Sequence, residues 1–253
     1  MVHQALHRRM ALSSSSKRTS FLSSFLTTLI AAIAGLIGAY IAFVRPWHLR
    51  WGATDDEATR SLLGDSLIEK PRLQATHAVT VHAPPEAIWP WLVQMGQGRG
   101  GFYSYEGIER LLGLRAGNAN QIIPDLQELH AADELPVAPD GAGLPVDIVV
   151  PYRTLVMHTD SPIPARVAVM QAGYYRSVTW TFHLEPIDGE NTRLIERWRA
   201  DWEPTPANNF VIRALLEPGA FIMERRMLLG IKARAERAWA EQKQRAQRDN
   251  NCA

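Results

Sequence analysis

A glycine-rich stretch, MGQGRGGFYSYEG from Met95 to Gly107, has the composition of loops that hold phosphate groups. A nucleotide loop of the GxxxxGK[ST] type needs a lysine for the phosphates and a hydroxyl for magnesium, at the start of a helix that follows a strand. The glycines here lack both residues and follow an expected helix. The stretch instead predicts a loop between two short helices, with the rings of Phe102, Tyr103 and Tyr105 turned toward the interior. It is either a purely structural loop or the gate of a cavity.

Glu196 is the ionisable residue whose position points most clearly to chemistry. In the run SVTWTFHLEPIDGENTRLIERWRADW it shares one strand face with Leu194 and Trp198, whereas Arg197 takes the opposite face. If the aromatic face lines a cavity, burial raises the pKa of Glu196 and suits it to act as an acid, a base or a ligand anchor. The alternative is an ion pair with an arginine of a neighbouring strand, such as Arg176.

The other reactive residue types lack the spacing of a catalytic or metal site. Histidines are scattered without the close pairs or His/Cys clusters of zinc sites: His77, His82, His130, His158 and His183. The chain has no GxSxG motif, and its one cysteine, Cys252, lies beside the C-terminus. We therefore expect no metal, no cofactor, no serine triad and no cysteine nucleophile.

Composition and charge indicate one folded domain with appendages. The 253 residues are 46% hydrophobic and carry a formal net charge of +1, so bulk charge does not favour a polyanionic partner. The C-terminal segment is basic at Arg245 and Arg248, but acidic residues are interleaved with its basic ones: Glu224, Glu236, Glu241 and Asp249. We interpret this mixture as a solvated helix face and expect no nucleic-acid partner.

An apolar segment near the N-terminus, Phe21 to Val44, predicts a membrane anchor because it contains no ionisable acid or base. A helix of this length extends about 36 Å, enough to cross a hydrocarbon core of about 30 Å. A cleaved signal peptide is the alternative, but its apolar region is usually about 7–15 residues. Basic residues are more numerous before the segment (Arg8, Arg9, Lys17, Arg18) than after it (Arg45, Arg50). This bias predicts a single-pass protein with a cytoplasmic N-terminus and the folded domain on the outer side.

The predicted organisation follows from these segments. We expect a cytoplasmic tail over 1–20, a transmembrane helix over 21–44, a juxtamembrane connector over 45–71, the folded domain over 72–245 and a disordered tail over 246–253. Trp47 and Trp51 in the connector either settle at the headgroup boundary or dock onto the folded domain.

Periodicity and turn residues predict the elements of the folded domain. We expect a strand over 75–82, short helices over 84–95 and 105–113, two strands over 145–160, a hairpin over 177–202 and a long helix over 210–244. The hairpin turns at Asp188 and Gly189. The long helix is interrupted or restarts at Pro218 and carries an apolar stripe that includes Met223 and Met227.

Three segments resemble the SRPBCC superfamily, which includes START domains, birch-pollen-allergen-like proteins and polyketide cyclase/dehydrase-like proteins. They are VTVHAPPEAIWPWLVQMGQGRGGFYSYEGIERLLG, NANQIIPDLQEL and EPGAFIMERRMLLGIKARAERA, and the resemblance covers roughly residues 46–240. It is closest to bacterial members with an N-terminal membrane segment. The resemblance implies an α+β helix-grip fold, in which a curved antiparallel sheet wraps a long C-terminal helix, with two short helices and a cavity between sheet and helix. It does not imply a set of catalytic residues.

The resemblance, together with the apolar side chains, predicts a membrane-tethered module that binds a hydrophobic or lipid-like small molecule in that cavity. The expected ligand-binding residues are Trp89, Phe102, Tyr103, Tyr105, Trp180, Phe182, Glu196, Trp198, Met223 and Met227. The alternative is a cyclase or dehydratase that uses Glu196, a histidine or Tyr103 for proton transfer. A third alternative is a scaffold protein whose core is solid.

Overall fold

The computed structural model describes residues 24–111, 113–114, 117–138, 142–160 and 175–252, and the chain divides into two units, Met1–Trp47 and His48–Ala253. In the first unit, residues 24–39 are helical, and a π-helical turn, η1 (Tyr40–Val44), continues into α2 (Arg45–His48). Ser24–His48 is the one helix of the described residues that is long and apolar enough to cross a membrane, a test that a signal sequence near the N-terminus also passes. The basic residues upstream, on which the predicted orientation depends, lie outside the described residues.

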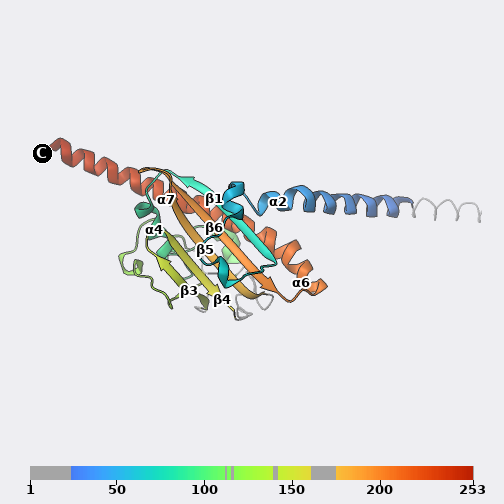
Figure 1. Ribbon diagram of the computed structural model, residues 1–253. Coiled ribbons are helices and arrows are strands. Elements are labelled where there is room, and N and C mark those ends of the chain that lie inside the picture. The colour runs from blue at the N-terminus through green and yellow to red at the C-terminus, as the bar shows by residue number, and fades with distance from the viewer. Residues whose placement is uncertain (1–23, 112, 115–116, 139–141, 161–174, 253) are drawn as a thin grey trace, which may run out of the picture. The chain divides into compact units, whose positions relative to one another are not determined.

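The second unit is built on a six-stranded antiparallel sheet in the order β1-β6-β5-β4-β3-β2 (Figure 1). The strands are β1 (Leu73–Val81), β2 (Glu134–Pro136), β3 (Gly143–Val150), β4 (Thr154–Thr159), β5 (Tyr175–Pro186) and β6 (Thr192–Trp202). Alternation along the predicted hairpin puts Trp180 opposite Trp198 on one face of the sheet. On the same face, His77 of β1 lies opposite Glu196 of β6.

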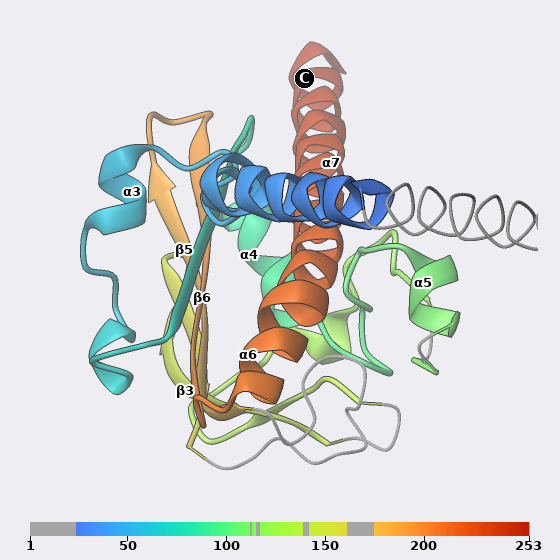
Figure 2. The same ribbon diagram turned by 90° about the vertical axis from the view of Figure 1, so that its right-hand side faces the viewer.

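A long helix, α7 (Glu217–Cys252), packs against this inner face of the sheet together with α4 (Pro85–Val93) (Figure 2). The other helices are α3 (Asp55–Thr59), η2 (Asp65–Leu67), α5 (Glu106–Leu111), η3 (Pro124–Leu126), α6 (Pro206–Val211) and the π-helical η5 (Ile212–Leu216). A curved antiparallel sheet, short helices and a long C-terminal helix form the predicted α+β helix-grip fold, which is thereby confirmed.

Local sequence explains where the helices begin. Prolines open α4 and α6 because the first turn of a helix has no acceptor for their missing amides. The long helix begins anew at Glu217 after the π-helical turn, as the Pro218 signal predicts, and it continues to Cys252 through the segment that we expected to be a disordered tail. Its apolar stripe is buried, with Met227 at 3% exposure and Ile231 at 0%.

The outer face of the sheet is covered by the residues that we expected to form a connector (Figure 2). The carbonyls of Leu49 and Trp51 accept hydrogen bonds from the amides of Thr76 and Ala78, so residues 49–51 lie along the free edge of β1. Residues 48–71 are thus part of the folded unit, and only the segment up to Trp47 falls outside it.

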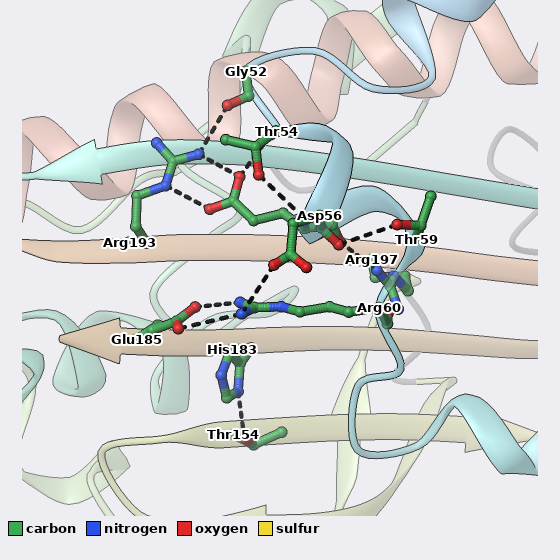
Figure 3. A network of polar contacts seen from close by, with 11 residues as sticks. Gly52, Thr54, Asp56, Thr59, Arg60, Thr154, His183, Glu185, Arg193 and Arg197 are labelled. Atoms are coloured by element: carbon green, nitrogen blue, oxygen red, sulfur yellow. Dashed lines mark hydrogen bonds and ion pairs between the residues drawn. The ribbon is translucent and has the colours of Figure 1, made fainter. Parts of the chain in front are cut away.

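Arginines of β6 hold this cover on the sheet (Figure 3). Arg193 donates two hydrogen bonds of 2.7 Å to the carboxylate of Glu57, which also completes the capping box of α3 with Thr54. Arg197, 1% exposed, forms an ion pair of 2.5 Å with Asp65 and donates to the carbonyls of residues 57 and 60. Arg197 faces away from the inner face as predicted, but it is buried because the cover encloses it.

Candidate functional site

An aromatic cluster fills the middle of the space between the sheet and α7. Trp180 packs on Phe182, Trp198 and Phe102, with ring centroids 5.0, 5.9 and 6.3 Å apart. All four side chains are buried and belong to the main core of the protein. The structure thus brings together four of the predicted ligand residues, but their rings pack against one another in the core.

The glycine-rich loop closes on itself and supports that cluster. Gly96 and Gly101 form an antiparallel bridge, and Phe102 follows directly to reach Trp180. Tyr103 adopts a positive φ of 57°, and its hydroxyl donates a hydrogen bond of 3.0 Å to the carbonyl of Trp91. Burial raises the pKa of Tyr103 to about 12, which keeps its phenol neutral and unsuited to proton transfer near pH 7.

The remaining predicted aromatic and methionine residues are buried, with the exception of Tyr105. Trp89 is buried on α4 and contacts the ring of Tyr152, with centroids 6.1 Å apart. Met223 and Met227 are buried on the inward stripe of α7. Tyr105 does not face the interior as we expected: it is 40% exposed, because it precedes the surface helix α5 and stacks against Arg226.

Glu196 lies at the centre of a buried polar cluster on the inner face. One carboxylate oxygen is 2.8 Å from Nδ1 of His77, and the other accepts a hydrogen bond of 2.7 Å from the indole N–H of Trp180. The alternative partner named from the sequence, Arg176, instead pairs with Glu203 at the surface. Glu196 is 0% exposed, so it is the inward carboxylate that the strand alternation predicts.

Glu224 of α7 completes the cluster from the opposite side. Its carboxylate lies 3.4 Å from Nδ1 of His77, and this is its only polar contact among the described residues. The residue is 9% exposed, so the expectation that it belongs to a solvated helix face is wrong. Glu224 and the buried stripe are on the same side of α7, because residues 224, 227 and 231 are spaced by three and four. Burial, together with the charge of Glu196, raises the pKa of Glu224 to about 8.

The environment of His77 favours its charged form. Burial opposes the charge, but the hydrogen bond with Glu196, the negative charges of Glu196 and Glu224 and the carbonyl of His48 outweigh burial and raise the pKa of His77 to about 9. Both ring nitrogens face oxygen acceptors, with Nε2 2.9 Å from the carbonyl of His48. A doubly protonated imidazole satisfies both acceptors at once.

A pocket opens beside this cluster, between the inner face of the sheet and the start of α7. Its volume is about 300 Å³, counted out to its open mouth. The walls are partly apolar and partly ionisable: His48, Leu49, Leu73, Ala75, His77, Tyr175, Trp198, Glu217, Ala220, Phe221 and Glu224. Of the predicted ligand residues, Trp198 lines this pocket. Glu196 does not line it but contacts His77, which does.

The pocket is therefore smaller and more polar than the cavity expected between sheet and helix. Most of that space is open to solvent at the mouth, and the enclosed part is about 10 Å³, room for roughly one water molecule, so only one end of a ligand fits it. Two of its carboxylates come from the first turns of α7, Glu217 and Glu224, and Tyr175 lies close enough for their charges, after burial, to raise the pKa of its phenol. The arrangement suits a small group with hydrogen-bond donors or positive charge.

Sequence reasoning missed His77, Glu224, His48 and Glu217. His77 and Glu196 are 119 positions apart, and only the antiparallel register of β1 with β6 makes them neighbours. One signal was available for Glu224: it lies three and seven positions before Met227 and Ile231, which are on the apolar stripe of the long helix.

No family model matches the sequence, and no curated protein matches it. Similar solved structures include KanY protein, with 12% identity and a TM-score of 0.39, covering 66% of this chain and 99% of that one. A protein from Mesorhizobium loti, MLL2253, has 19% identity and a TM-score of 0.35, covering 64% and 97%. Norcoclaurine synthase from Thalictrum flavum has 13% identity and a TM-score of 0.35, covering 63% and 91%. At scores this low a likeness carries no functional argument, so the function must be argued from the pocket itself.

Proposed function

We propose that this protein is a membrane-tethered binding module that holds one end of a small hydrophobic or lipid-like molecule in the pocket between the sheet and α7. The observation that carries the proposal is the pocket's construction: apolar walls from Leu73, Trp198 and Phe221 surround buried carboxylates at its inner end. Ligand sites commonly combine apolar walls with a few polar groups that fix orientation.

The residues that line the pocket restrict the chemical class of ligand that it can bind. Because Glu217 and Glu224 both line the pocket and His77 is paired with Glu196 behind it, an anionic group would meet two further carboxylates. An amine, a hydroxyl or an amide would find acceptors there. We therefore propose a ligand with an apolar body and a polar end that donates hydrogen bonds.

The tether is the helix Ser24–His48, within which lies most of the span predicted over 21–44. A bilayer concentrates hydrophobic molecules, so an anchor raises the local concentration of such a ligand around the folded unit. The helix-grip architecture and the three segments quoted above also lead us to propose that the chain is a membrane-anchored member of the SRPBCC superfamily, with its folded domain on the outer side.

The test is uptake of ligand by the full chain in nanodiscs made with a lipid extract, followed by native mass spectrometry. Ala220→Trp places an indole in the pocket lining and should lower the bound fraction at least tenfold. Ala246→Trp makes the same change at an exposed position of α7 and should leave binding unchanged. Equal uptake by both variants, or no uptake by a folded wild-type chain, would contradict the proposal.

A second function, proton transfer by a cyclase or dehydratase, is favoured by one observation. The acid–base pair of His77 and Glu196, 2.8 Å apart, lies beside a third ionisable group, Glu224, that faces a pocket. Once a ligand is identified, Glu196→Gln separates the two functions: loss of turnover with retained binding supports an enzyme, and unchanged turnover removes its best candidate.

A further inference from the structure

Three ligating side chains converge at the inner end of the pocket from three different elements. His77 comes from β1, Glu196 from β6 and Glu224 from α7, and one nitrogen or oxygen atom from each lies within 4.8 Å of the other two. Nδ1 of His77 is 2.8 Å from Glu196 and 3.4 Å from Glu224. In a tetrahedral site with bonds of about 2.0–2.1 Å, ligand atoms are separated by about 3.3 Å. The two distances from His77 are thus close to those between ligands on one small ion, and the two carboxylates lie within 4.8 Å of each other.

Two hydrogen bonds from behind the cluster hold the donor atoms in this orientation. Nε2 of His77 contacts the carbonyl of His48 at 2.9 Å, which keeps a proton on Nε2 and directs Nδ1 into the cluster. The indole N–H of Trp180 holds one oxygen of Glu196 at 2.7 Å and leaves the other facing His77. Metal-binding histidines typically donate their second ring N–H to a backbone carbonyl or a carboxylate, and metal-binding carboxylates are themselves hydrogen-bonded.

Glu224 is the member of the cluster that lines the pocket. Its side chain is about nine-tenths buried, and no described residue outside the cluster offers it a hydrogen bond. Its one described partner is His77, 3.4 Å away. A cation bound on the pocket side would stabilise the charged form of this buried carboxylate.

We propose that His77, Glu196 and Glu224 bind a divalent first-row transition-metal ion of the Zn²⁺ class, with a coordination position open to the pocket. One imidazole nitrogen and two carboxylate oxygens suit Zn²⁺, Mn²⁺ or Fe²⁺, whereas Ca²⁺ and Mg²⁺ prefer oxygen ligands alone. Binding of the ion displaces the Nδ1 proton of His77 and the carboxyl proton of Glu224, since all three metal ligands must be deprotonated. Three protein ligands with an open position are typical of a metal site that also binds a small molecule.

This inference rests on the pocket of the proposed function, where a neutral hydroxyl, amine or amide on the ligand could coordinate the ion through a lone pair, but it does not depend on that ligand. Zn²⁺ binding measured without lipid tests the metal site alone. Ligand uptake measured in excess chelator tests the pocket alone. The two proposals can therefore fail separately.

The experiment uses the full chain in detergent micelles, stripped with chelator and dialysed. Calorimetric titration with Zn²⁺ should give one ion per chain, and Co²⁺ should produce a visible absorption band. Glu224→Gln removes one ligand with little change in shape and should weaken Zn²⁺ binding at least tenfold. Glu241→Gln makes the same change at an exposed position of α7 and should leave the affinity unchanged.

Trp180→Phe serves as a second variant because it keeps an aromatic ring in the core but removes the indole N–H that positions Glu196. It should weaken Zn²⁺ binding by roughly 10–100-fold and shift the Co²⁺ band, which a purely structural role would not do. If circular dichroism shows that Glu224→Gln does not fold, Trp180→Phe becomes the variant that tests the proposal. Absence of stoichiometric Zn²⁺ uptake by folded wild-type protein would overturn the proposal, as would equal affinities for the ligand and control variants.

Discussion

The two faces of the sheet bury charges in opposite ways. On the outer face, Arg197 makes contacts through Nε and both terminal nitrogens, and its partner Asp65 also forms an ion pair of 2.9 Å with Arg199. On the inner face, Glu224 has a single polar contact among the described residues and lines a pocket. Glu196 and Arg197 are consecutive residues of β6, so one strand places a buried charge on each face of the sheet.

This difference distinguishes the buried charges that stabilise the fold from those that could bind a ligand. Where the cover of residues 48–71 encloses the arginines, all three guanidinium nitrogens of Arg193 and of Arg197 donate hydrogen bonds, so these two residues can fix the cover on the sheet but offer nothing to a ligand. Where α7 crosses the cluster, the donor atoms of His77, Glu196 and Glu224 face one another across a shared space. Convergence of three ionisable side chains beside a pocket, more than burial itself, distinguishes the candidate site.

The largest expected effect comes from breaking the outer network. Arg197→Leu leaves Asp65 with one cationic partner, Arg199, and removes the donors from a buried and a partly buried backbone carbonyl. Removing one member of a buried ion pair typically costs about 3–5 kcal/mol, and we expect a loss of that size in the free energy of unfolding. Denaturant titration of the full chain measures it. A loss below about 1 kcal/mol would mean that the outer network is not structural.

The pH dependence of stability should separate the two faces in chelator-treated protein. The pKa values of Glu57 and Glu185 are lowered: for Glu57 the bonds to Arg193 and Thr54 outweigh burial, and for Glu185 the bond to Arg60 dominates. Their stabilisation is therefore present above pH 4.5 and is lost as the pH falls through the lowered values. Acid destabilisation is assigned to the outer face.

The inner face should respond in the opposite direction. The pKa values of His77 and Glu224 are raised to about 9 and about 8, so the folded chain holds protons that the unfolded chain has released. Stability should fall as the pH rises from about 4.5 to 8 because of Glu224 and from about 6.5 to 9 because of His77, with a slope near 1.4 kcal/mol per pH unit for each extra proton. Glu224→Gln should reduce that slope below pH 8 and leave the acid limb unchanged. A wild-type curve that is flat above pH 7 would contradict the assignment.

Substitution of Glu224 should affect stability much less than substitution of Arg197. Near pH 7 the carboxyl of Glu224 is mostly protonated, because burial disfavours its charge, and Gln has a similar shape and no charge. We therefore expect Glu224→Gln to change the free energy of unfolding by less than about 1 kcal/mol, within the range of substitutions that break no network. Denaturant titration at pH 7 in chelator checks this value. A loss as large as that of Arg197→Leu would make Glu224 a structural residue.

Local pattern predicted the fold well because its signals act over short distances. Strict alternation in the β5–β6 hairpin predicted that Trp180, Trp198 and Glu196 share one face of the sheet. The apolar stripe predicted that Met227 lies on the buried side of α7. The cover of residues 48–71 was not predicted, because its polar composition suits a linker and only the buried arginines of β6 explain how it is held.

The candidate site was predicted only in part, because most of its contacts join residues that are far apart in the sequence. Glu196 stood out because its own strand carries the pattern, but its partners come from elements far away in the sequence. His77 occupies an ordinary alternating position of β1, and its role arises from the pairing register of two strands that are not consecutive. Such pairings depend on the whole topology, which periodicity within one segment does not contain.

The smallest expected effect concerns Arg176, the residue that the sequence offered as a partner of Glu196. Its ion pair with Glu203 is exposed, and such pairs contribute about 0–1 kcal/mol because water screens them. Arg176→Leu should therefore change the free energy of unfolding by no more than that and leave Zn²⁺ affinity unchanged. It is also the matched control for Arg197→Leu, since both variants remove an arginine from the central strands. A change in Zn²⁺ affinity would show that Arg176 reaches Glu196 in solution, and the charge of the inner cluster would then be compensated by an arginine instead of a bound cation.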